Sequence, residues 1–158
     1  MIKYPIYVTI DTNILESAKF DFSEKIFEHR RFFPDEPIKA YMYVSKPVCA
    51  ITGILYSGKR HKLEDWKKDF SNDMDAVERI TDYMESYTYA MEIIEFQETS
   101  KISLDDLKRD IEGFIAPQSY YYLDKSPILK YIEDNIVIKE INVKHSFDII
   151  EAKQVCVH

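Results

Sequence analysis

Six or seven short runs of β-branched and aromatic residues are the feature that most limits the fold of this chain. Runs of this kind favour β-strands. Helix-like segments stand between some of them, but strands and helices do not alternate regularly, as a doubly wound parallel sheet would require. The pattern therefore predicts an α+β protein built on a small mixed β-barrel with inserted and flanking helices. The expected strands are residues 6–10, 25–33, 38–45, 48–57 and 87–97, with further strand-like runs after residue 136.

Several segments between these strands have the apolar spacing or the capping residues of helices. Leu63, Trp66 and Phe70 recur at helical spacing in one of them, and an acidic segment follows it. Ser103 and Ser126 are suitable N-caps for two others. A further short helix is expected directly after the first strand, where three polar residues can cap it. The expected helices are residues 12–20, 63–70, 73–85, 104–111 and 126–132.

Length and composition indicate a single acidic domain spanning residues 1–158. Of its 158 residues, 46% are apolar, which is enough for one sizeable core. The 21 Lys and Arg against 28 Asp and Glu give a formal charge of −7, which argues against strong non-specific binding to nucleic acid. Basic residues nevertheless gather in residues 58–68 and acidic ones in the helix that follows, so a local positive cleft is compatible with the negative total. The alternative is two ordinary solvated helices.

The cysteines, histidines and apolar runs indicate the compartment and the chemistry to expect. Cys49 and Cys156 lie far apart and match no metal spacing, as in the reduced thiols of a cytosolic protein. The four histidines show no metal spacing either. No signal-peptide pattern opens the chain, and no run approaches the roughly 20 apolar residues of a membrane span. We therefore expect a cytoplasmic protein without a metal, a cofactor or a membrane partner.

Residues 21–34 combine charge and aromatic side chains in a way that is unusual for a solvated loop. This mixture predicts a strand whose aromatic rings enter the core and whose ionic groups lie at the mouth of a cleft. Strict alternation would place Lys25 and Arg31 on one face of that strand and Glu28 and Arg30 on the other. All four can line one cleft only if a bend breaks the alternation near residues 26–27. The charged residues are Lys25, Glu28, His29, Arg30 and Arg31.

The order of short motifs resembles the ASCH family, a branch of the PUA-like barrels. The family pattern G-x-K-x-x-E-x-R is matched by Ser23, Lys25, Glu28 and Arg30, with Ser23 in place of the glycine. The resemblance covers about residues 6–132, leaves residues 136–158 as a C-terminal extension, and extends to bacterial and archaeal ASCH-domain transcriptional regulators. The other matching residues are Arg31, Phe32 and Pro34; Tyr43, Ser45, Pro47, Val48 and Gly53; Tyr89, Ala90, Glu92 and Ile93; and Pro117, Gln118, Ser119 and Tyr120.

The resemblance implies a module that binds RNA or a modified base, and the side chains suit that chemistry. Cations contact the phosphate backbone, polar groups read base edges and aromatic rings stack on unpaired bases. We therefore expect single-stranded RNA or a nucleotide to bind in a cleft lined by residues 25–31. The expected ligand-binding residues are Lys25, Glu28, Arg30, Arg31, Ser45, Gln118, Ser119 and Tyr120.

Two other functions remain open at the level of sequence. Some small ASCH relatives are amidohydrolases that act on acetylcytidine, and in such an enzyme Lys25 would be the catalytic base or nucleophile. This chain has Glu28 where those relatives have threonine, so a non-enzymatic function is favoured. The third class is a protein-interaction module without catalysis, acting through the Tyr-rich turn or through residues 136–158, which could also form a homodimer.

Overall fold

The computed structural model describes residues 5–10, 25–124 and 126–157. The helix expected at residues 12–20 and the Ser23 substitution lie outside the described residues. Within them, the chain forms a mixed sheet and four α-helices, which confirms the α+β class. None of the described helices is long and apolar enough to cross a membrane.

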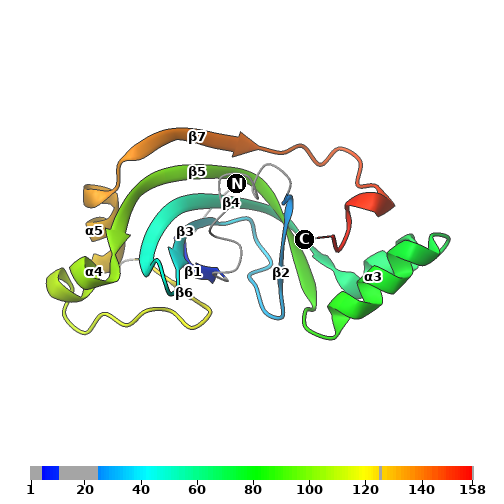
Figure 1. Cartoon of the computed structure of the whole chain (residues 1–158), viewed down its shortest axis with the longest axis horizontal. Helices are drawn as coiled ribbons and strands as arrows, with labels where there is room; N and C mark the ends of the chain where they lie inside the picture. Colours follow the sequence, from blue (N-terminus) through cyan, green and yellow to red (C-terminus); the bar gives the residue numbers. More distant parts are fainter. Residues whose placement is uncertain (1–4, 11–24, 125, 158) are drawn as a thin grey trace.

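Seven strands form one sheet in the order β2-β5-β4-β3-β1-β6, and β7 pairs with the same edge of β5 as β2 does. Among the described strands, only the pairing of β1 with β3 is parallel. Figure 1 shows β3, β4, β5 and β7 as nested arcs. The strands are β1 (Pro5–Ile10), β2 (Phe27–Arg30), β3 (Lys39–Val44), β4 (Ala50–Lys62), β5 (Tyr89–Ser103), β6 (Tyr120–Tyr122) and β7 (Ile138–Lys144).

The sheet is open, whereas the sequence predicts a barrel. Its strand order begins at β2 and ends at β6, and no pairing between these two strands closes it among the described residues. The long strands β4 and β5 bend instead through several shifts in register. One shift lies beside Gly53, as a glycine inside a strand predicts. A Cβ atom at Gly53 would lie 2.6 Å from the ring of Phe96, so this close packing needs glycine.

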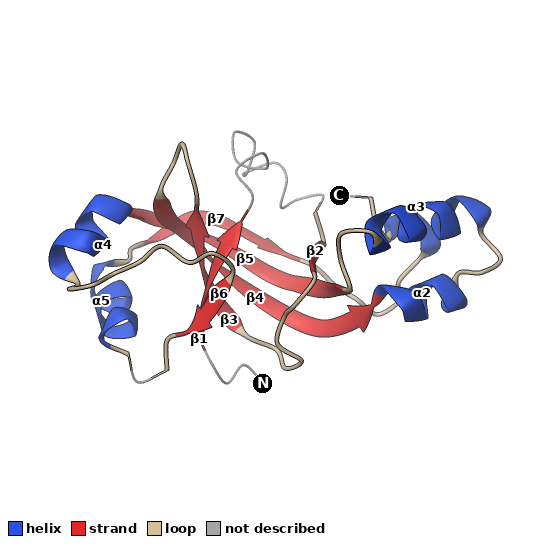
Figure 2. Cartoon of the chain, turned by 90° about the horizontal axis from the view of Figure 1, so that it is seen from below, coloured by secondary structure: helices blue, strands red, loops and turns tan. Residues whose placement is uncertain are grey.

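The helices lie at the two ends of the sheet. Figure 2 shows α2 (Leu63–Asp69) and α3 (Met74–Met84) at one end, and α4 (Leu104–Asp110) and α5 (Pro127–Asn135) at the other. Asp73, Ser103 and Ser126 cap α3, α4 and α5 by accepting hydrogen bonds from backbone N–H groups of the first turn. Two of these caps, Ser103 and Ser126, are those that the sequence predicts.

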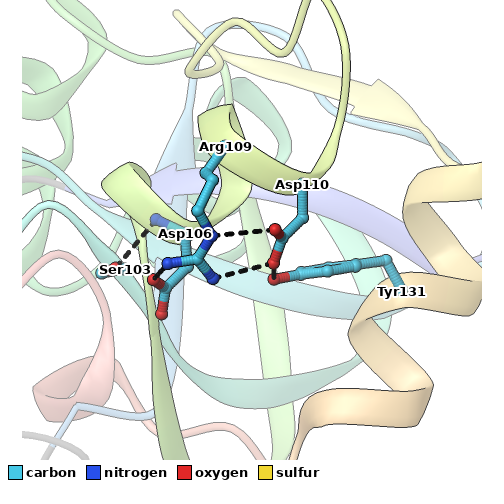
Figure 3. A network of polar contacts seen from close by, with 5 residues as sticks. All are labelled: Ser103, Asp106, Arg109, Asp110 and Tyr131. Carbon is cyan, nitrogen blue, oxygen red and sulfur yellow. Dashed lines mark hydrogen bonds and ion pairs between the residues drawn. The ribbon is translucent and has the colours of Figure 1, made fainter.

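A polar network on the surface joins α4 to α5 (Figure 3). Arg109 donates two hydrogen bonds of 2.9 Å to Asp110, and the Tyr131 hydroxyl donates one of 2.6 Å to the same carboxylate. These hydrogen bonds, that of Arg109 first, lower the pKa of Asp110 to about 2. The charged groups satisfy one another and are exposed, so we interpret this network as a link between helices rather than as a binding site.

The described residues form three hydrophobic core clusters. The first packs β3, β4 and β5 around residues such as Met42, Leu55 and Met91, with Phe33 from the loop after β2. The second lies on the side of α4 and α5, around Tyr41 and Ile54. The third packs α2 and α3 against β2 and the end of the chain. The strand β2 therefore lies between the first and third clusters.

Candidate ligand-binding site

A buried cluster of three charges lies on and beside β2. The Glu28 carboxylate forms an ion pair of 2.8 Å with the Lys25 ammonium. It also accepts a hydrogen bond of 3.0 Å from Nε of Arg30. The side chains of Glu28, Lys25 and Arg30 are 10%, 8% and 17% exposed, respectively. The cluster thus holds two positive charges and one negative charge largely away from water.

Lys25 and Arg30 meet at Glu28 because β2 is shorter than the sequence predicts. The strand covers only Phe27–Arg30, so Lys25 precedes it and is not bound by its alternation. Glu28 and Arg30 lie on one face of β2, as predicted. Lys25 can therefore reach Glu28, although strict alternation would place these two residues on opposite faces.

The cations of this cluster keep Glu28 ionised. Burial alone would raise the pKa of the carboxyl, but the nearby charges of Lys25 and Arg30 outweigh burial and hold this pKa below its ordinary value of 4.5. Both carboxylate oxygens of Glu28 already face a cation. Glu28 therefore positions Lys25 and Arg30, and the cations are the groups that can interact with a ligand.

Strands β5 and β4 extend this charged face. Met91 of β5 is the Cα partner of both Glu28 and Arg60, and Tyr89 is the Cα partner of both Arg30 and Lys62. Cross-strand partners point to the same side of a sheet. We call this row the platform, defined as Glu28 and Arg30 of β2, Tyr89 and Met91 of β5, and Arg60 and Lys62 of β4.

The Arg60 guanidinium is held over the platform. It lies 3.9 Å above the centre of the Tyr89 ring, which is a cation–π contact. Its Nη1 donates a hydrogen bond of 2.7 Å to the Phe33 carbonyl, and its Nη2 lies 3.3 Å from the exposed carboxylate of Asp35. These contacts hold an arginine stacked over an aromatic ring, and this combination of groups suits the phosphate and base of a nucleotide.

Of the remaining predicted site residues, some lie near this platform and others lie far from it. Tyr120 packs against Phe33, with ring centroids 5.8 Å apart, and so joins the same core cluster as Met91. Gln118 and Ser119 are exposed and precede β6. Ser45 follows the far end of β3, where its carbonyl accepts hydrogen bonds from the backbone of Val48 and Cys49. The structure thus brings Tyr120 toward the platform and leaves Ser45 at the other end of the sheet.

Arg31 points away from the charged cluster. Its guanidinium donates to the Ser86 carbonyl at 3.3 Å and to the Glu85 carbonyl at 3.2 Å, just after α3. Cations at the C-terminal end of a helix stabilise its free carbonyls. The alternation of the strand predicts this separation of Arg31 from Arg30.

Arg60 and Lys62 are platform residues that the sequence does not single out. The composition of residues 58–62 predicts a basic lead into a helix, but these residues continue β4 as far as Lys62. The basic composition of this segment is visible in the sequence, whereas its pairing with β5 is not. Tyr89 is part of a matched motif, but the motif alone assigns it no role.

A second buried pair of polar side chains, His61 and Glu92, lies on the opposite face of β4 and β5. Nε2 of His61 is 2.7 Å from Oε2 of Glu92, and Oε1 of Glu92 accepts a hydrogen bond of 3.2 Å from the Lys59 N–H. The His61 ring stacks on Trp66 at 5.1 Å. His61 and Trp66 also line a cavity of about 460 Å³ where β4 meets α2; its other lining residues are Asp35, Lys59, Arg60, Lys62, Asp65 and Asp69.

No group of three or more His, Cys, Asp or Glu side chains that could hold a metal ion occurs in the part of the chain that the structure describes.

Solved structures with the same fold include ASCH proteins from Zymomonas mobilis. The ASCH protein itself is 18% identical, with a TM-score of 0.57 over 87% of this chain and 97% of that one. A serine-to-alanine variant is 19% identical, with a TM-score of 0.58 over 82% and 95%. A tyrosine-to-phenylalanine variant is 18% identical, with a TM-score of 0.55 over 83% and 98%. No protein-family model and no curated protein sequence matches the chain. The expected fold of ASCH type is thereby confirmed.

Proposed function

We propose that this chain, whose fold is that of the ASCH domain, binds single-stranded RNA or a nucleotide at the platform. The observation that carries the proposal is the buried cluster in which Lys25 and Arg30 are held together by one carboxylate, that of Glu28. Charges that are largely removed from water attract an anion more strongly than solvated ones do. A phosphate group that approaches this cluster can therefore interact with both cations at once.

The aromatic and arginine side chains of the platform support a nucleotide rather than a simple anion. Tyr89 lies between Arg30 and Lys62 in the sheet, and Arg60 covers its ring. Proteins that bind single strands combine cations for the backbone with rings or guanidinium planes on which bases stack. Tyr120 can add a further ring at the Phe33 side of the platform.

A direct test compares Arg30 with its neighbour Arg31. A fluorescent single-stranded RNA is titrated with the wild type and with the variants Arg30→Ala, Arg30→Lys and Arg31→Ala at several salt concentrations. Loss of a charge-assisted hydrogen bond should lower the affinity of Arg30→Ala by about tenfold or more. Arg30→Lys keeps the positive charge beside Glu28. It should therefore lose only the part of the RNA affinity that depends on the forked geometry of the guanidinium group.

The Arg31→Ala variant is the matched control, because it removes the same charge one residue away. Its affinity should stay close to that of the wild type, since Arg31 donates to carbonyls after α3. Equal losses in Arg30→Ala and Arg31→Ala would place binding elsewhere. An absence of RNA and nucleotide binding at low salt would overturn the proposal. Thermal melting of each variant checks that it is folded.

The hydrolase alternative predicts a different result and is tested with a further variant, Lys25→Ala. A nucleophilic lysine needs its amine free to attack, whereas Nζ of Lys25 lies 2.8 Å from the carboxylate of Glu28 in an ion pair. The ion pair thus supports binding over catalysis. Release of acetate from acetylcytidine by the wild type, abolished in Lys25→Ala, would favour the hydrolase instead.

A further inference from the structure

The cavity between β4 and α2 opens beside the platform. Strand β3 pairs with β4 only as far as Tyr56, and the backbone of Ile38 bonds to Ser57. Beyond Ser57, no strand among the described residues pairs with this edge of β4. The cavity of about 460 Å³ lies at this open edge, with Asp65, Trp66 and Asp69 of α2 on its other side.

Arg60 belongs to both the platform and the cavity. It lies over Tyr89 on the platform, and it also lines the cavity together with Lys62. Arg30 and Lys62 flank Tyr89 from the two neighbouring strands. Two strand spacings separate them, which corresponds to about 10 Å between their backbones. A ligand that reaches from Arg30 to Lys62 is therefore longer than one phosphate group.

The charges that line the cavity are divided between its two walls. Lys59 and Lys62 are exposed on the β4 wall, and Asp65 and Asp69 are exposed on the α2 wall. Asp35 is engaged with Arg60, and His61 with Glu92. A phosphate would therefore be attracted to the β4 wall and repelled by the α2 wall, where a carboxylate can instead accept hydrogen bonds from ribose hydroxyls or base amines.

We propose that the ligand is an RNA strand of at least two nucleotides that occupies two subsites, the charged cluster of β2 and the cavity between β4 and α2. In the second subsite, Lys59 and Lys62 contact the backbone phosphate. This inference rests on the proposed function, since it assigns the length of ligand that the same platform takes. It assigns Lys59 and Lys62 a binding role that no sequence motif gave them.

The test measures affinity as a function of ligand length. A uridine mononucleotide and a single-stranded RNA hexamer are titrated against the wild type, the double variant Lys59→Ala/Lys62→Ala and the control Lys67→Ala/Lys68→Ala. The control removes two lysines of α2 that do not line the cavity. The hexamer should bind the wild type at least about tenfold more tightly than the mononucleotide, because it also engages the second subsite.

The Lys59→Ala/Lys62→Ala variant should lose most of this gain for the hexamer, whereas its affinity for the mononucleotide should fall much less, because Lys25 and Arg30 of the first subsite are unchanged. Its salt dependence should also fall, by about 0.7 in the slope of log K against log salt for each phosphate that the variant no longer neutralises. The variant Asp65→Asn/Asp69→Asn should bind the hexamer at least as well as the wild type, because it removes negative charge from the α2 wall. The six substituted positions of these three double variants are partly or fully exposed. The variants should therefore fold, and melting curves would verify this.

The outcomes separate this inference from the proposed function. If neither ligand binds, the proposed function is wrong and the inference falls with it. If mononucleotide and hexamer bind equally, the inference is wrong and the function stands. Equal losses in Lys59→Ala/Lys62→Ala and Lys67→Ala/Lys68→Ala would show that only the overall charge matters, and would also overturn the second subsite.

Discussion

At the scale of the single residue, Glu28 is the side chain on which the platform depends. It is 10% exposed and is the shared partner of Lys25 and Arg30. Removing one member of a buried ion pair is far more costly than the pair is worth, because the remaining charge stays buried without that partner. The two cations that we assign to ligand binding are therefore held in place by a residue that need not touch the ligand.

We predict that Glu28→Gln lowers the free energy of unfolding by about 3 kcal/mol near neutral pH, since it removes the counter-charge that two buried cations share. Chemical denaturation measures this loss. The neighbours of Glu28 lower its pKa in the folded state, so its stabilising effect is complete above about 4.5 and is lost as the pH falls toward the lower folded value. The difference between the wild type and Glu28→Gln should thus be constant above pH 4.5 and shrink below it.

An exposed glutamate provides the control for this prediction. Glu112 lies in the loop after α4, and Glu112→Gln should change the stability little at any pH. A difference between Glu28→Gln and the wild type that grows on acidification would contradict the assigned ionisation of Glu28.

The residue scale also shows how far a sequence can predict a site. Lys25, Glu28 and Arg30 follow one another closely along the chain, so a local motif can reveal them. Arg60 and Lys62 reach the platform only because β5 lies between β2 and β4. Such a neighbour depends on pairing over long sequence separations, which neither spacing nor composition indicates.

At the scale of the element, the C-terminal segment supports β2 from the face opposite the platform. After β7, the His145 N–H donates to the Ile94 carbonyl, and the Phe147 ring packs 5.3 Å from that of Phe27. The chain continues into a short 3-10 helix, Ala152–Gln154, followed by the buried residues Val155 and Cys156. The residues beyond 135 thus supply a strand, as their strand-like runs predict, and also part of the third core cluster.

We predict that Phe147→Ala lowers the free energy of unfolding by about 2 kcal/mol, because the half-buried ring loses its packing against Phe27. Phe27 stands between Lys25 and Glu28 in the chain, so the affinity for single-stranded RNA should also fall. Chemical denaturation and RNA titration measure the two effects.

Ile149→Ala serves as the comparison, since Ile149 is 79% exposed in the same segment. It should change neither stability nor affinity appreciably. If Phe147→Ala lost stability but bound RNA like the wild type, the C-terminal segment would stabilise the fold without positioning β2.

Strand boundaries show why elements are predicted better than their ends. The interiors of β3, β4 and β5 have the β-branched and aromatic residues that favour strands, and the sequence predicts all three. Residues 58–62 have a poor composition for a strand, yet they extend β4 because residues 60–62 pair with residues 89–91 of β5. The segment 25–33 has a better composition, but only four of its residues find a partner strand. Pairing therefore decides the length of a strand where propensity does not.

At the scale of the whole molecule, the positive platform stands out against an acidic total. The formal charge is −7, and α3, at the same end of the sheet as α2, carries acidic side chains such as Asp75, Glu78 and Asp82. The open sheet leaves the end of β4 accessible, whereas a closed barrel would pair it. The α+β class is predictable from the spacing of the strand-like and helix-like runs in the sequence. Closure of the sheet into a barrel depends instead on pairing between β2 and β6, the first and last strands of the sheet, and local sequence patterns do not indicate such pairing.

This distribution of charge leads to a prediction about the form of RNA. A single strand can follow the platform and place its phosphates near Lys25, Arg30 and Lys62 alone. A rigid duplex carries a second line of phosphates, which would approach Asp65 and Asp69 of α2, beside Arg60 and Lys62, and be repelled. We therefore expect a duplex of the same sequence to bind at least about tenfold more weakly than the single strand in low salt, as a competition titration can measure.

The salt dependence of that preference tests its cause. Repulsion between exposed charges is screened as ionic strength rises, with a Debye length of about 10 Å at 0.1 M salt and about 3 Å at 1 M. If acidic side chains exclude the duplex, the preference for the single strand should narrow in high salt, even as both affinities fall. A preference that stays constant across salt would instead mean that the bases of a single strand stack on the platform rings and that a paired base cannot reach them. The variant Tyr89→Leu keeps an apolar side chain beneath Arg60 but removes the ring. If stacking is the cause, this variant should reduce the preference for the single strand. If electrostatic repulsion is the cause, the variant should leave the preference unchanged.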